Sequence, residues 1–494
     1  MLSSLPEAIG ILLSFEGLLV LVLGTILGIT LGAMPGIGST VAVAIVLPFT
    51  LTMSQAPAVL LLLAVYAGSV YGGSIAAILI NTPGTPQSAA TCLDGYPMAQ
   101  RGDAGLALGW ATVASVVGGL VSAVVLIFAA PQLAAFALQF GPIETFSLIL
   151  LGMTCIVSVS TGSVINGLTA GMIGIFLSTV GGDPILGEMR FTFDNWQLYA
   201  GFNLLAVVIG VFALSEVLMR ASAPIRTVSE LVKFNGVKLP SLAMWKGRFR
   251  NLGKSVLIGN VIGVLPGTGA ATAAFISYAE GRRSSPNKEN FGKGEPDGIV
   301  ASEAANNAVT GGALVPTMAL GIPGDAITAV MLATLTLHGI TPGPKLVEDN
   351  PTLIAAIFAG FFIINLLLLP LGMLLSRVAA PILRVREAFM MTAIVILCAV
   401  GIYFVRGNPF DLLVLGGAGV VGFILRRQGF PMAPLVIGMV LGPTLELTLR
   451  QGLILTDGSF KAFFTGSPIA LVLAVTAVIA LAFPFLRSLK RKTP

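Results

Sequence analysis

The chain has 494 residues, of which 55% are hydrophobic and 10% are charged, and its formal net charge is +5. Soluble proteins carry about 25% charged residues, so this composition excludes an ordinary soluble enzyme and indicates an all-α polytopic membrane protein. The basic residues gather in short loops beside apolar runs, which is typical of membrane topology and not of nucleic-acid binding. Apolar runs of about 20 residues can span a bilayer, and we expect about 11–12 transmembrane segments.

Two apolar runs in the first half end at breaks. The run 17–31 leads into the stretch 32–40, which contains Pro35 and Gly36, and the run 58–80 leads into the stretch 81–86, which contains a second Pro-Gly pair. Proline removes a backbone donor and glycine adopts conformations that other residues avoid, so each stretch should end a helix. Further apolar segments lie at 40–51, 104–129, 143–159, 164–180 and 198–218.

A basic linker follows the first half. Residues 219–254 are rich in lysine and arginine, and Glu230 is the single acidic residue among them. The positive-inside rule predicts that this linker is cytoplasmic, as is the basic C-terminal tail. The connection 130–141 then falls outside by the same tally.

The second half repeats the landmarks of the first in the same order. Pro266-Gly267 corresponds to Pro35-Gly36, and the glycine-rich stretch 310–325 corresponds to 71–85. An internal duplication explains this order, and the alternative is a chance match between glycine-rich apolar segments. Loop charges favour repeats of inverted topology. The predicted units are a first repeat (1–218), the linker (219–254), a second repeat (255–465), and a final span with its cytoplasmic tail (466–494).

The Pro-Gly breaks are the strongest candidate for a binding site. A half-helix that begins after such a break presents unpaired N–H groups and a positive dipole end, which bind a carboxylate without a buried cation. The alternative is a proline kink whose backbone is satisfied by neighbouring helices. The predicted substrate-binding residues are Pro35, Gly36, Gly38, Ser39, Thr40, Asn81, Thr82, Gly84 and Thr85 in the first half, and Pro266, Gly267, Thr268, Gly269 and Thr272 in the second.

A second polar group follows helical spacing. Glu303, Asn306, Asn307 and Thr310 occupy positions i, i+3, i+4 and i+7, which share one helix face. A carboxylate within a membrane helix usually marks a pathway, although Glu303 could instead be solvated near the end of its helix. Asp325, just after Gly324, could pair with a coupling cation or cap the next helix. The predicted ion-coupling residues are Glu303, Asn306, Asn307, Thr310, Gly324 and Asp325.

Motifs of soluble enzymes are absent from the sequence. His338 is the single histidine, so a two-histidine metal motif cannot form, and no Gly-x-Ser-x-Gly elbow occurs. The three cysteines are scattered without metal-ligand spacing. We therefore expect no enzymatic activity, no metal site and no cofactor.

The stretches 32–40, 71–86, 263–272 and 310–325 resemble the large membrane subunit of the tripartite tricarboxylate transporter family. The resemblance covers nearly the whole chain and implies a secondary importer of di- or tricarboxylates in the bacterial inner membrane. Members of the family differ in substrate, so citrate itself does not follow from it. The resemblance also implies a periplasmic solute-binding protein, a small membrane subunit, and symport with Na⁺ or H⁺. A homo-oligomer is compatible with this interpretation. The rival interpretations are a passive anion channel and a membrane-embedded enzyme.

Overall fold

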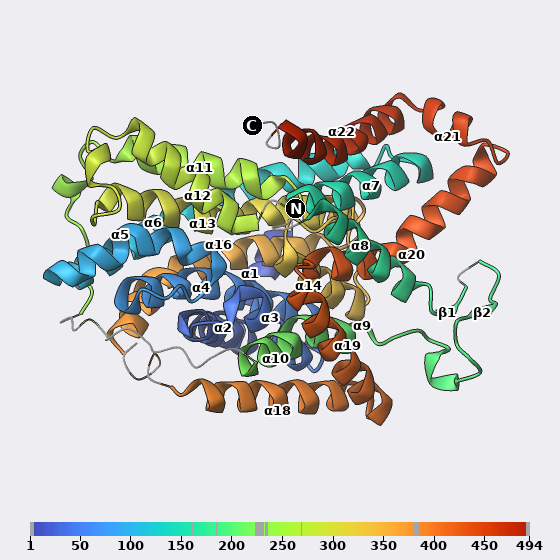
Figure 1. The fold of residues 1–494 in the computed structure, drawn as a ribbon, viewed down its shortest axis with the longest axis horizontal. Coiled ribbons are helices and arrows are strands. Elements are labelled where there is room, and N and C mark those ends of the chain that lie inside the picture. The colour runs from blue at the N-terminus through green and yellow to red at the C-terminus, as the bar shows by residue number, and fades with distance from the viewer. Residues whose placement is uncertain are drawn as a thin grey trace.

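The computed structural model describes residues 4–159, 163–183, 185–222, 232, 236–267, 269–378, 381, 383 and 385–490. These residues are almost entirely helical (Figure 1), apart from a short antiparallel ribbon in which β1 pairs with β2. The helices and strands are α1 (Leu5–Leu13), α2 (Phe15–Ala33), α3 (Gly38–Thr50), α4 (Gln55–Ile80), η2 (Pro86–Ser88), α5 (Ala89–Met98), η3 (Ala99–Asp103), α6 (Ala104–Ala137), α7 (Pro142–Val159), α8 (Val164–Ser178), β1 (Gly181–Gly182), β2 (Met189–Arg190), η4 (Trp196–Leu198), α9 (Leu204–Ile209), η5 (Gly210–Leu214), α10 (Ser215–Ala221), η6 (Leu242–Trp245), α11 (Phe249–Val264), α12 (Gly269–Ser284), η7 (Lys288–Asn290), α13 (Pro296–Leu320), α14 (Ala326–Leu337), α15 (Leu346–Asp349), α16 (Pro351–Arg377), α18 (Glu387–Arg406), α19 (Pro409–Arg427), α20 (Met432–Leu455), α21 (Phe460–Thr465) and α22 (Pro468–Lys490).

In the described residues, eight helices are long and apolar enough to cross a membrane, which is fewer than the predicted 11–12 segments. The difference arises because several predicted spans are short helices. The α3 and α14 helices have 13 and 12 residues, since each begins just after a break. Pro131 lies within α6, so the connection that follows this helix is shorter than predicted.

The two halves use the same packing of helices around their first breaks. In the first half, α2 packs on α4 through glycines, and a Cβ at Gly32 would lie 2.2 Å from the carbonyl oxygen of Ser69. In the second half, α11 packs on α13 in the same way, and a Cβ at Gly259 would lie 2.4 Å from the carbonyl oxygen of Ala305. Such contacts require glycine because the helix backbones touch. In Figure 1 the α11–α13 group lies above the α2–α4 group.

The α13 helix lies at the centre of the molecule. It packs on α6, α11 and α12, and 23 of its 25 residues are buried. A Cβ at Gly118 of α6 would lie 2.3 Å from the carbonyl oxygen of Ala304, so these two helices also touch by their backbones. The polar residues of α13 are therefore enclosed by protein on all sides.

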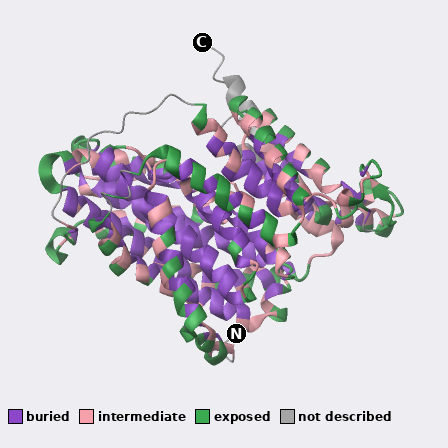
Figure 2. Cartoon of the chain, turned by 90° about the horizontal axis from the view of Figure 1, so that it is seen from below, coloured by how far each residue is buried: buried purple, intermediate pink, exposed green. Residues whose placement is uncertain are grey.

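Exposed residues lie along the outer sides of the helices (Figure 2), and many of them carry large apolar side chains. Phe389 and Phe404 of α18 are 69% and 82% exposed, and Leu413 of α19 is 72% exposed. Large apolar side chains that point outward along whole helices indicate contact with lipid. The observed surface agrees with the apolar composition, and the chain is a multi-pass membrane protein.

The β1–β2 ribbon projects from the helices and is held by charged groups. Asp183 accepts hydrogen bonds from the backbone N–H groups of Leu186 and Ile185 and forms an ion pair with Arg450 at 2.9 Å. These backbone donors, followed by Arg450, lower the pKa of Asp183 to about 2. The carboxylate therefore stays ionised at neutral pH and ties the ribbon to the end of α20.

Candidate functional site

Both Pro-Gly pairs interrupt helices as predicted. The α2 helix ends at Ala33 and α3 begins at Gly38, and in the second half α11 ends at Val264 and α12 begins at Gly269. Gly36 and Gly267 have φ angles of 91° and 84°, and the glycines two residues later also have positive φ. Side chains with a Cβ rarely adopt these conformations, so glycine is required for the local backbone. Thr268 lies outside the described residues.

The later breaks also follow the prediction. The α4 helix ends at Ile80, and Asn81 then adopts a left-handed conformation with φ of 52° and ψ of 29°. The α13 helix ends at Leu320, and Gly321 adopts the same region with φ of 70°. Both loops then turn back towards the long helix that precedes them. A Cβ at Gly84 would lie 2.9 Å from the Cα of Gly73, and one at Gly324 would lie 2.6 Å from the Cα of Ala313.

The two breaks of each half contact each other. In the first half, Gln87 Nε2 donates a hydrogen bond of 3.0 Å to Ser39 Oγ. In the second half, the N–H of Gly267 donates a hydrogen bond of 2.7 Å to the carbonyl oxygen of Gly324. In each half, therefore, residues about fifty positions apart in the sequence are in contact. These contacts gather most of the predicted substrate-binding residues into two groups.

Contacts between helices of different halves connect the two groups. The α3 helix, which starts at the first break, packs against α14 of the second half, and α12 packs against η2 of the first half. The helices α3, α12 and α14 each begin at a break. The N-terminus of α3 has no side-chain cap, so its first N–H groups and its partial positive charge suit oxygens of an anionic ligand.

The predicted substrate-binding residues differ in how far they are buried. Asn81 is exposed, and Thr82 Oγ1 makes a long hydrogen bond of 3.3 Å to the carbonyl oxygen of Ile80. Thr40 and Thr272 are partly buried near the starts of α3 and α12. Thr85, in contrast, is buried, and its N–H donates to Ser88 Oγ at 3.3 Å. The set therefore spans a range from the surface to the interior.

Glu303 is fully buried and has neutral partners. Ser115 Oγ of α6 donates a hydrogen bond of 2.9 Å to Oε2, and Thr91 of α5 contacts Oε1. In the described part of the chain, no lysine or arginine forms an ion pair with this carboxyl group. The alternative that Glu303 is solvated near a helix end is wrong, because the side chain has 0% exposure. A buried carboxyl group without a cationic partner is costly, which favours a functional role.

Replacing Glu303 by alanine should destabilise the protein more than replacing it by glutamine. Alanine leaves the buried hydroxyl of Ser115 without its acceptor, at about 1–3 kcal/mol, whereas Thr91 keeps its contact with Ser302 Oγ. Glutamine keeps the volume and one acceptor oxygen. Thermal unfolding in detergent measures the difference, and the exposed Glu289→Ala variant is the control. Wild-type unfolding temperatures for both Glu303 variants would contradict the expectation.

The neighbouring amides on α13 differ in their hydrogen bonding. Asn307 Nδ2 donates to the carbonyl oxygen of Glu303 at 3.1 Å, and Thr310 Oγ1 donates to the carbonyl oxygen of Asn307 at 2.6 Å. Asn306 is also fully buried, but within the described residues neither atom of its amide has a hydrogen-bond partner. Buried polar atoms in native proteins are nearly always paired, so the amide of Asn306 is suited to a polar ligand.

Asp325 caps the α14 helix. Its Oδ1 accepts hydrogen bonds from the N–H groups of Ile327 and Thr328 at 3.0 and 2.8 Å, and its Oδ2 accepts one of 2.6 Å from the hydroxyl of Tyr66. The capping role that the sequence left open is thus present in the structure. Tyr66 belongs to α4, so this carboxylate also joins the two halves.

The structure adds two residues that the sequence analysis did not assign to the site. Gln87 bonds Ser39, and the guanidinium of Arg220 lies against the first break, where its Nε donates to the carbonyl oxygen of Gly36 at 3.2 Å. The sequence predicted a break without a cation, and the structure places one beside it. Arg220 is 184 residues away along the chain, and its only sequence signal was its position at the start of the basic linker.

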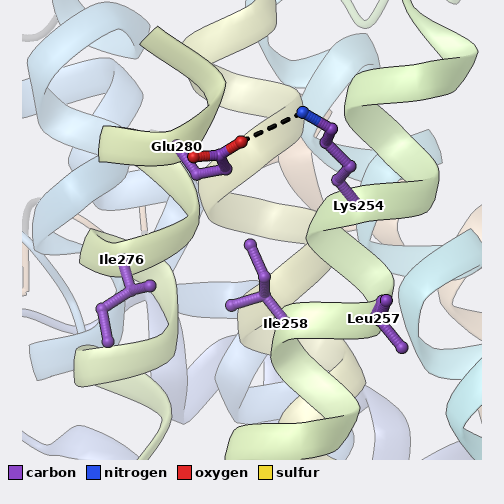
Figure 3. Close-up of a pocket in the computed structure, with 5 residues that line it drawn as sticks. All are labelled: Lys254, Leu257, Ile258, Ile276 and Glu280. Carbon is purple, nitrogen blue, oxygen red and sulfur yellow. Dashed lines mark hydrogen bonds and ion pairs between the residues drawn. The ribbon is translucent and has the colours of Figure 1, made fainter. Parts of the chain in front are cut away.

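A shallow surface pocket lies elsewhere, between α11 and α12 (Figure 3). Its volume is about 370 Å³, and a Lys254–Glu280 ion pair of 3.0 Å lies beside three apolar side chains. It includes none of the predicted site residues. The candidate functional site therefore consists of the Pro-Gly breaks and the α13 face, which is the side of α13 that carries Glu303, Asn306, Asn307 and Thr310.

Comparison with known proteins identifies the family of the chain. The family model described as "Tripartite tricarboxylate transporter TctA family" matches residues 18–437. An "Uncharacterized 52.8 kDa protein in TAR-I ttuC' 3'region" of Agrobacterium vitis is 38% identical over 476 residues, which cover 95% of this chain and 94% of that protein. An "Uncharacterized protein in TAR-II ttuC' 3'region" of the same organism is 38% identical over 233 residues, which cover 47% of this chain and 96% of that protein. No solved structure matches the chain. The chain therefore belongs to the tripartite tricarboxylate transporter TctA family and is a membrane transport protein, not an enzyme.

Proposed function

We propose that this chain is the translocating subunit of a secondary active importer of organic di- or tricarboxylates in the bacterial inner membrane. The observation that carries the proposal is the pair of Pro-Gly breaks, each followed by a half-helix and each in contact with a second break. The N–H groups after Pro35 and Pro266 would hold the carboxylates of the substrate. Membership in the family supports the substrate class, because the family's description names tricarboxylates.

The α13 face is the proposed coupling site. Asn306 offers unpaired amide atoms, and Glu303 offers a buried carboxyl group that lacks a cationic partner in the described residues. Oxygen atoms of this kind suit Na⁺, and a carboxyl group can also bind a proton. We propose Na⁺ or H⁺ as the coupling ion, with Asn307, Thr310, Gly324 and Asp325 shaping the site. A periplasmic solute-binding protein and a small membrane subunit would complete the system.

Uptake into liposomes tests the proposal. The chain is reconstituted with its small membrane subunit and its solute-binding protein, and uptake of radiolabelled citrate, succinate and tartrate is followed under imposed Na⁺ and H⁺ gradients. We expect accumulation of one of these carboxylates above its external concentration, driven by one gradient. Uptake that stops at equilibrium would support the rival passive channel.

The inverted arrangement of the two repeats has its own test. Gln139 lies in the connection after α6, and Val385, which is 41% exposed, lies in the connection after α16. We expect an impermeant thiol reagent to label Gln139→Cys from outside and Val385→Cys from the cytoplasm, because loop charges place the two connections on opposite sides. Both variants are made in a protein whose wild-type cysteines are replaced by serine, so that the introduced cysteine is the one that reacts. Labelling of both positions from the same side would contradict the inverted arrangement and indicate parallel repeats.

A further inference from the structure

The guanidinium of Arg220 packs directly on the backbone of the first break. Arg220 lies near the end of α10, and its Nε donates to the carbonyl oxygen of Gly36. A Cβ at Gly36 would lie only 1.5 Å from the Cζ atom of Arg220. The guanidinium thus occupies the space that the absence of a side chain at Gly36 leaves. A cation at this point is next to the proposed carboxylate site.

Two glutamates share this guanidinium, and they are held differently. Glu216 pairs with Arg220 at 3.0 Å and also with Arg426, so it is fixed from two sides. Glu387, at the start of α18, pairs with Nη1 of Arg220 at 2.7 Å, and its side chain is 45% exposed. No second ion pair holds Glu387 within the described residues. Exposed ion pairs contribute little to stability, so Glu387 is easily displaced.

The guanidinium also has capacity for another acceptor. In the described part of the chain, Nε and Nη1 of Arg220 have partners, whereas Nη2 has none. An arginine binds a carboxylate best through two parallel N–H groups, and Nη1 and Nη2 form such a fork. Departure of Glu387 would free Nη1 beside the unpartnered Nη2, so that both nitrogens could bind one carboxylate.

We propose that Arg220 recognises a carboxylate of the transported substrate at the first break, and that Glu387 occupies the same guanidinium until the substrate arrives. The inference rests on the proposed function, because it places substrate at this break. Glu387 then acts as an internal competitor whose carboxylate takes the place of the substrate's carboxylate. Arg220 adds specificity for carboxylates that backbone N–H groups alone do not supply.

The test compares two variants with opposite expected effects. The concentration dependence of uptake is measured in liposomes with whichever of radiolabelled citrate, succinate or tartrate the wild type takes up. Arg220→Lys keeps the charge but loses the fork, so the half-saturating concentration should rise about tenfold or more. Glu387→Gln weakens the internal competitor, so the half-saturating concentration should fall about two- to fivefold.

A purely structural ion pair predicts a different pattern. Both variants would then lower the amount of folded protein without shifting the half-saturating concentration in opposite directions. Arg426→Lys is the matched control, because Arg426 also pairs with Glu216 but donates to the carbonyl oxygen of Phe212 instead of that of Gly36, and no shift is expected there. An unchanged value for Arg220→Lys, or a higher value for Glu387→Gln, would overturn the inference. If Arg220→Lys does not fold, the direction of the Glu387→Gln shift decides alone. Absence of uptake by the wild type would instead remove the proposed function, and this inference with it.

Discussion

A single methyl group at Gly36 or Gly267 should abolish uptake. Both glycines have φ angles that disfavour a Cβ, 91° and 84°, and such strain costs about 1–3 kcal/mol per residue. At Gly36 the new Cβ would also collide with the guanidinium of Arg220. At Gly267 the backbone N–H donates to Gly324, so a change in dihedral angle would separate the two breaks of the second half. Uptake by reconstituted Gly36→Ala and Gly267→Ala, normalised to folded protein, measures the effect.

Alanine substitutions at two other glycines distinguish the effect of backbone strain from the effect of losing the binding site. Gly102, between α5 and α6, has a φ of 95° and no atom near the position of its Cβ, so Gly102→Ala introduces comparable strain outside the site. Gly253→Ala adds a methyl group to α11 in open space without positive φ. We expect both controls to transport. Near-normal uptake in the Gly36 and Gly267 variants would support the kink interpretation, in which the breaks bend helices without binding substrate.

Side-chain hydroxyls at the breaks should matter less than the backbone. Ser39→Ala removes the acceptor of one hydrogen bond from Gln87, and a neutral hydrogen bond contributes about 0.5–1.5 kcal/mol. Thr268→Ala is expected to behave similarly. If the backbone holds the substrate, these variants retain measurable uptake where the glycine variants have lost it.

The positions of the breaks could be predicted from the sequence because their cause is local. Proline and glycine act on the dihedral angles of their own residues, so helix ends at 33 and 264 follow from Pro35-Gly36 and Pro266-Gly267. The buried face of α13 was also predictable, since helical spacing places Glu303, Asn306 and Thr310 together. Both inferences needed only residues close in sequence.

Contacts between distant segments could not be predicted in this way. Arg220 reaches Gly36 across 184 positions, and Tyr66 reaches Asp325 across 259. Neither pair follows a periodicity or motif, because helix packing alone brings the partners together. The described residues contain eight helices of spanning length, fewer than the 11–12 predicted segments, for a related reason. Hydropathy does not distinguish a short helix that starts at a break inside the protein from one that crosses the bilayer.

Neutralising Asp325 should weaken the ion dependence of uptake without loosening the α14 helix. Asparagine caps helices about as well as aspartate, so Asp325→Asn keeps an acceptor for the N–H groups of Ile327 and Thr328 and removes the charge together with the acceptor of the Tyr66 hydroxyl. Asp325→Ala, in contrast, loses the cap, at about 0.5–2 kcal/mol, and leaves the Tyr66 hydroxyl unpaired. We therefore expect Asn to change ion dependence and Ala to lower the unfolding temperature as well. Uptake at varied Na⁺ and H⁺ gradients and thermal unfolding measure the two effects.

Tyr66→Phe is the matched control for the charge of Asp325. It removes the hydrogen bond to Oδ2 but leaves the carboxylate and its cap in place. If the charge couples the ion, Tyr66→Phe retains ion dependence that Asp325→Asn loses. Equal losses in both variants would assign the effect to the contact between the halves. Unchanged ion dependence in Asp325→Asn would confine Asp325 to capping, and coupling would then have to arise at Glu303 and Asn306, whose buried groups lack a cation in the described residues.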